Sequence, residues 1–141
     1  MRFAGMDSFV KNIFMKDIKQ LHAQHLELYS EIAFLKQEIN FFLKLLSKAY
    51  SDSIDKRAIN VLDGYWKEFE RCGEQLALVS ERIENCEKHA KSLFAEKGIA
   101  RCQDDEECTM GLKHISRDLK IIKESFYAFM IDNYRRVYEK A

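Results

Sequence analysis

The chain has 141 residues, of which 47% are hydrophobic and 33% charged, a composition typical of one folded, soluble domain rather than of a disordered chain. Lys plus Arg and Asp plus Glu each number 23, so the formal net charge is zero. The chain therefore lacks the basic surplus that is typical of nucleic-acid-binding proteins. Proline, the commonest helix breaker, does not occur. We therefore expect a single helical domain over residues 1–141.

The N-terminal stretch, Met1 to Val10, lacks the apolar core of a signal peptide, and Met6 is an alternative start to Met1. No window contains the roughly 18 apolar residues of a membrane span, so we expect no membrane contact. A cytoplasmic location follows as the default. The four cysteines would then be reduced thiols.

The first helix is predicted over residues 8–50, with Asp7 or Ser8 as its cap. Seam residues recur at alternating steps of four and three, a seven-residue repeat that predicts one long helix packing against partner helices. His25 is the one member that is not apolar. The seam comprises Phe14, Ile18, Leu21, His25, Leu28, Ile32, Leu35, Ile39, Phe42, Leu46 and Ala49.

A turn is predicted at Ser51-Asp52-Ser53, because small polar side chains favour turns and helix caps over helix interiors. The second helix is then expected over residues 53–97, capped by Asp52 or Ser53 and ended by Gly98. A connection this short makes the first two helices antiparallel. The second seam comprises Ala58, Leu62, Tyr65, Phe69, Cys72, Leu76, Val79, Ile83, Cys86, Ala90 and Leu93.

The third helix is predicted over residues 104–139, opening with Asp104 and with Glu107 three residues later. The expected fold is therefore all-α, an up-down-up bundle of three long antiparallel helices with coiled-coil-like packing. The third seam comprises Leu112, Ile115, Leu119, Ile122, Phe126, Phe129 or Met130, Asn133 or Tyr134, and Val137.

Counting away from the two loops predicts which seam residues face each other. The first turn places Leu46 near Leu62 and His25 near Ile83; the second loop places Leu93 near Leu112 and Cys86 near Leu119, among other layers. In this register all four histidines fall in the same half of the bundle. They are His22, His25, His89 and His114.

Clustered histidines raise the possibility of a metal site, since neutral imidazoles bind transition metals and bundles hold such sites between facing helices. The Glu-x-x-His pairs of di-iron bundles are absent, and the favoured interpretation is a buried, hydrogen-bonded His25 with three solvated histidines. Cys72 and Cys86 are expected as small core residues. Cys102 and Cys108 bracket the acidic loop, either as a labile disulfide or as two plain cysteines.

Catalytic motifs are missing: the chain has no Gly-rich phosphate loop, nucleophile elbow or paired-cysteine redox motif. We therefore expect a protein that is not an enzyme and has no cofactor. An alternative is a bundle that binds a metal or small ligand through the four histidines, and a third possibility is an apolar ligand between the helices.

A second apolar stripe lies outside the seams of the first and third helices, beyond what a three-helix core requires. It favours a homodimer or another helical partner, and protein contact as the function; the alternative is a core that uses wider stripes. The proposed interface residues are Phe34, Phe41, Leu45, Tyr127, Ile131, Tyr134 and Tyr138.

Overall fold

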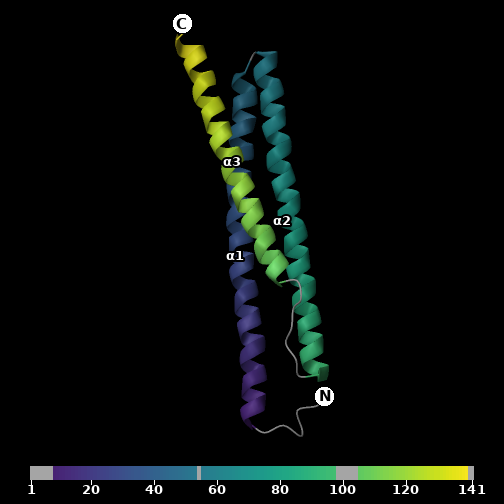
Figure 1. The fold of residues 1–141 in the computed structure, drawn as a ribbon. Coiled ribbons are helices and arrows are strands. Elements are labelled where there is room, and N and C mark those ends of the chain that lie inside the picture. Colours follow the sequence, from purple (N-terminus) through teal and green to yellow (C-terminus); the bar gives the residue numbers. More distant parts are fainter. Residues whose placement is uncertain (1–7, 54, 98–104, 140–141) are drawn as a thin grey trace. The chain divides into compact units, whose positions relative to one another are not determined.

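Three long helices make up the structure, a computed structural model that describes residues 8–53, 55–97 and 105–139 (Figure 1). Helix α1 spans Ser8–Asp52, α2 spans Lys56–Lys97 and α3 spans Asp105–Glu139. Side chains are described for residues 19–53, 55–96 and 106–135. The helices pack against each other without any strand in these ranges, which confirms the predicted all-α three-helix bundle.

The start of α2 differs from the prediction by three residues. Asp55 is the cap, since its carboxylate Oδ1 accepts a 3.0 Å hydrogen bond from the backbone N–H of Arg57. Ser51 does not make a turn, because its hydroxyl donates to the carbonyl of Ser47 one turn earlier and stays within α1. Helix α1 therefore continues to Asp52. The predicted caps Asp7 and Asp104 and the predicted stop at Gly98 lie outside the described residues.

The predicted seams form the buried core. Eight seam residues of α1, from His25 to Ala49, are buried. On α2, the fully buried seam residues include Leu62, Phe69, Leu76 and Ile83. Cys108 was missed: it lies one turn before Leu112 on α3 and extends the third seam, with 1% of its surface exposed. Phe14 and Ile18 lie in α1, but their side chains are not described.

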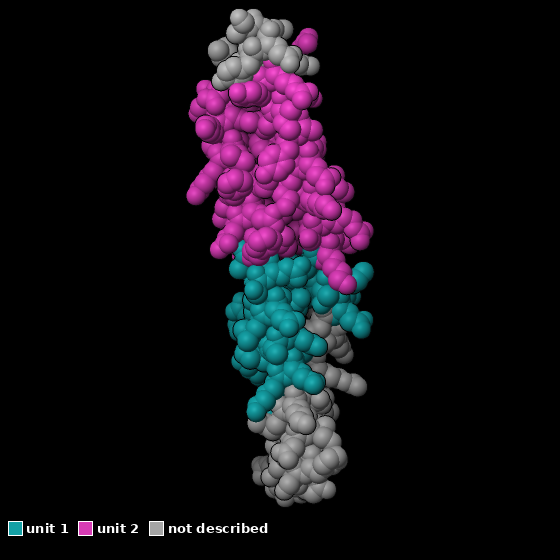
Figure 2. Space-filling view, turned by 90° about the vertical axis from the view of Figure 1, so that its left-hand side faces the viewer, with its two compact units in different colours: residues 1–33, 77–112 teal, residues 34–76, 113–141 magenta. Residues whose placement is uncertain are grey.

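The chain divides into two compact units, which Figure 2 colours separately. Unit 1 comprises residues 1–33 and 77–112, and unit 2 comprises residues 34–76 and 113–141. Each of the three helices contributes one segment to each unit.

The pairing of α1 with α2 agrees with the prediction to within about one turn. In unit 2 the Phe42 and Phe69 rings stack at 5.3 Å. In unit 1, His25 Nδ1 lies 3.9 Å from Glu87 Oε2, one turn beyond the predicted Ile83.

The predicted pairing of α2 with α3 is wrong by roughly three to four turns. In unit 1 a Cβ atom built on Gly111 would lie 3.6 Å from Val79, whereas the prediction placed Leu93 beside Leu112. In unit 2 the Phe69 and Phe126 rings lie 6.0 Å apart. The prediction assumed that the loop leaves the two helix ends level. Seven residues separate α2 from α3, and such a connection can reach up to about 25 Å.

Candidate functional site

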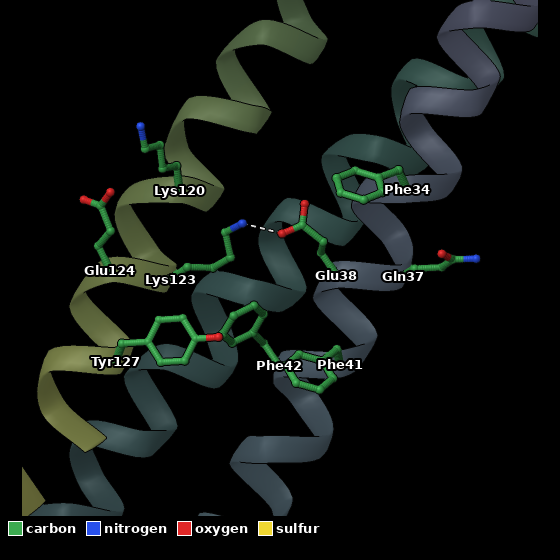
Figure 3. A pocket seen from close by; sticks show the side chains of 9 residues that line it. All are labelled: Phe34, Gln37, Glu38, Phe41, Phe42, Lys120, Lys123, Glu124 and Tyr127. Carbon is green, nitrogen blue, oxygen red and sulfur yellow. Dashed lines mark hydrogen bonds and ion pairs between the residues drawn. The ribbon is translucent and has the colours of Figure 1, made fainter. Parts of the chain in front are cut away.

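The strongest candidate site is an open groove between α1 and α3 in unit 2, with a volume of about 520 Å³ (Figure 3). We call it the aromatic groove. Its lining is mostly apolar, with a few charged side chains at its centre and rim. Helix α1 supplies Phe34, Gln37, Glu38, Phe41 and Phe42, and α3 supplies Lys120, Lys123, Glu124 and Tyr127.

The floor of the aromatic groove is a packed cluster of rings. Phe42 is almost fully buried and stacks on Phe69 of α2 at 5.3 Å. Its ring meets Phe126 at 6.0 Å and Tyr127 at 5.3 Å, both in edge-to-face geometry. Such pairs contribute about 0.5–1.5 kcal/mol each beyond the area they bury. The floor is therefore anchored to all three helices and does not need to be ordered by a ligand.

One ion pair bridges the two walls of the aromatic groove. Lys123 Nζ on α3 donates a hydrogen bond to the Glu38 carboxylate on α1, and both side chains are partly buried. The same ammonium lies 6.0 Å from the centre of the Phe42 ring, where the ring quadrupole attracts it. In Figure 3, Lys123 reaches towards α1, whereas Lys120 and Glu124 point to the opposite side of α3. The centre of the groove is thus electrically neutral.

The rings that edge the aromatic groove are exposed. The exposed fraction is 59% for Phe34, 54% for Phe41 and 48% for Tyr127. Further along α3, Ile131 and Tyr134 are also more than half exposed. These five side chains are not core residues of the described chain, contrary to the wider-core alternative.

The remaining two residues of the predicted interface differ from these five. Leu45 is partly buried in α1. Tyr138 belongs to α3, but its side chain is not described. The groove floor and its ion pair, Phe42, Glu38 and Lys123, were not predicted as site residues. Phe42 was assigned to the seam alone, and no sequence signal paired Glu38 with Lys123.

A second open hollow, in unit 1, has a different chemistry. It has a volume of about 530 Å³ and is lined by Glu27, Glu31 and Glu106 together with Gln24, Leu28, Thr109 and Met110. Three carboxylates on an open surface remain hydrated and repel one another. The aromatic groove is the better candidate for binding, because burial of its rings would release more free energy.

The histidines follow the favoured interpretation in their burial: His25 is fully buried, and His22, His89 and His114 are exposed. In unit 1, Glu87 lies between two imidazoles, accepting a hydrogen bond from His22 Nδ1 and standing 3.9 Å from His25 Nδ1. Burial, followed by the carboxylates of Glu87 and Glu84, raises the pKa of the neighbouring Tyr29 phenol. The phenol therefore stays protonated, which avoids a further negative charge beside Glu87.

The four histidines do not share one unit. His22, His25 and His89 belong to unit 1, and His114 belongs to unit 2, because the pairing of α2 with α3 differs from the predicted one. Within the described ranges, no three His, Cys, Asp or Glu side chains come together as a group that could hold a metal ion.

The cysteines are buried where the structure describes them. Burial is the main cause of the raised pKa of the Cys72 thiol, although Arg71 opposes it, so the thiol stays protonated and is a poor nucleophile. Cys108 is a second buried thiol. Cys86 is buried as predicted but is disulfide-bonded, which corrects the expectation of four reduced thiols. Cys102 lies outside the described residues.

Comparisons with family models, with curated proteins and with solved structures find no match to this chain. In the portion of the chain that is described, no helix carries an apolar stretch that could span a bilayer.

Proposed function

We propose that this chain is a non-enzymatic helical-bundle protein that acts through protein contact, and that its first partner is a second copy of itself. The observation that carries the proposal is the run of exposed aromatic and aliphatic side chains on unit 2. Phe34, Phe41 and Tyr127 edge the aromatic groove, and Ile131 and Tyr134 continue the stripe along α3. Monomeric soluble proteins rarely expose large contiguous apolar patches, and such patches commonly mark interaction sites.

Burial of these side chains would supply a large part of the driving force for association. A large aromatic side chain buries about 150–250 Å² in full, so covering its exposed half contributes about 2–3 kcal/mol at 25 cal/mol per Å². Three such rings would offset much of the free-energy cost of association, which is roughly 4–15 kcal/mol. Tyr127 and Tyr134 also suit a partly wet interface, because a tyrosine hydroxyl can keep a hydrogen bond to water.

Two further properties support association. The ring cluster under the groove and the Glu38–Lys123 ion pair hold the walls in place, so little conformational entropy remains to be lost on binding. The formal net charge of zero means that two copies do not repel one another at long range.

The test compares matched charge insertions by sedimentation velocity. Tyr134→Glu places a carboxylate in the proposed interface, whereas Leu78→Glu places one at an equally exposed apolar site on α2 in unit 1. We expect Tyr134→Glu to shift the protein to monomer with unchanged helical circular dichroism, and Leu78→Glu to sediment like the wild type. An associated Tyr134→Glu variant, or equal effects of the two substitutions, would remove the assigned face.

A further inference from the structure

Besides its buried seam, helix α3 carries a line of exposed residues on the side away from the core. The residues Ile121, Glu124, Ala128, Ile131 and Arg135 recur at steps of three, four, three and four, and every one of them is exposed. We call this set the outer stripe. Alternating steps of three and four place side chains in a line along one helix face and suit close packing against another helix. More than half of both Ile121 and Ile131 is in contact with solvent.

The outer stripe is complementary to itself when read in the reverse direction. If two copies of α3 run antiparallel about a point midway between residues 129 and 130, position i of one copy faces position 259 − i of the other. Glu124 then faces Arg135 of the partner subunit, and Ala128 faces Ile131 of the partner subunit. Each pair occurs twice, as a two-fold interface requires. The small Ala128 side chain leaves room for the larger isoleucine.

We propose that two copies of this chain associate along the outer stripe, with α3 antiparallel to α3 of the partner subunit and with reciprocal pairs between Glu124 and the partner's Arg135. This inference rests on the proposed self-association. It adds which helix forms the interface, that the two helices run antiparallel, and which residues face each other.

Charge decides the direction of packing. A parallel pair of α3 helices in register would place Glu124 against Glu124 of the partner subunit and Arg135 against the partner's Arg135. Like charges in direct opposition destabilise an interface, and opposite charges select the partner and its orientation. The antiparallel arrangement exchanges both repulsions for attractions. An unrelated helix would lack this complementarity unless it carried the same reversed pattern.

The outer stripe is continuous with the aromatic groove. Ile131 belongs to both the proposed interface and the outer stripe, and Glu124 lines the groove rim while pointing away from α1 (Figure 3). Tyr127 lies four residues before Ile131 and Tyr134 three residues after it, so both tyrosines flank the outer stripe on α3. A helix seated on the outer stripe would therefore cover part of these exposed rings.

The test is a charge swap measured by sedimentation at low ionic strength. Glu124→Arg and Arg135→Glu each turn two attractive pairs into two repulsive ones, and exposed pairs are worth about 0.2–1 kcal/mol each. We expect either single variant to raise the dimer dissociation constant roughly tenfold, and the double variant to restore wild-type affinity. High salt should shrink the effect of the single variants. The control Glu74→Arg makes the same charge change on an exposed position of α2 and should leave association unchanged.

The possible outcomes separate the two proposals. If Tyr134→Glu weakens association but the double charge swap does not restore either single variant, the antiparallel register is wrong and the proposed self-association stands. If the wild type is monomeric at all concentrations, both proposals fail. Dimers that are unaffected by Tyr134→Glu and by all the charge variants would place the interface on another face.

Discussion

Phe42 and Phe41 are adjacent in sequence, yet Phe42 is buried and Phe41 is exposed, and truncating each in turn tests the roles that we propose for them. Phe42 is 3% exposed and its ring contacts those of Phe41, Phe69, Phe126 and Tyr127. Phe42→Ala leaves a cavity in this cluster, and buried Phe→Ala changes cost about 3–5 kcal/mol. Phe41 keeps 54% of its surface in water and has one edge contact with Phe42. Phe41→Ala removes a ring of which about half is buried, and alanine favours the helix slightly more than phenylalanine, so it should cost less, about 1–2 kcal/mol.

Urea unfolding followed by circular dichroism at low protein concentration measures both free energies. We expect the midpoint of Phe42→Ala to fall sharply while its m-value stays close to that of the wild type. Phe41→Ala should lose clearly less stability than Phe42→Ala, but associate more weakly than the wild type at high concentration. A loss below about 1.5 kcal/mol for Phe42→Ala, or equal losses for the two variants, would refute the assignment of one ring to the core and the other to the interface.

Three further results are expected. Asp55→Ala should lower the free energy of unfolding by about 0.5–2 kcal/mol because it removes the α2 cap, whereas Asp52→Ala should change it by less than about 0.5 kcal/mol; equal losses in urea unfolding would argue against Asp55 as the cap. Burial and the hydrogen bond to the Asp63 carboxylate raise the pKa of Tyr50 to about 12. The folded state then retains a proton that the unfolded state loses above about pH 10, so stability should decline between about pH 10 and 12. Tyr50→Phe should lack that part of the decline, and an identical pH profile in both proteins would contradict it. Elemental analysis of protein purified without added metal should find no stoichiometric transition metal; finding one would favour a metal-binding function through the histidines.

The sequence was sufficient to predict the helices, because the seven-residue repeat and the absence of proline leave few alternatives. Helix ends agree with the structure within three residues. The cap of α2 was missed because Ser47 and Ser51 can bond to carbonyls inside a helix as readily as they can form a turn. Cys108 is a thiol, as one of the two alternatives predicted, but it was left out of the third seam because its nearness to the acidic loop concealed its place one turn before Leu112.

Pairing between helices was predictable only where the connection is tight. The turn between α1 and α2 fixes their register to about one turn, whereas the seven residues between α2 and α3 leave several registers within reach. The exposed rings of the aromatic groove were predicted as a surplus of apolar residues on two helices. The Glu38–Lys123 pair and the stacking of Phe42 on Phe69 depend on register, which the sequence does not determine.

Sedimentation equilibrium of the wild-type protein from low to high micromolar concentration tests the central claim most directly. Self-association through unit 2 predicts a mass that rises with concentration towards twice the 16.7 kDa of one chain. A mass that stays at 16.7 kDa up to several hundred micromolar would contradict it.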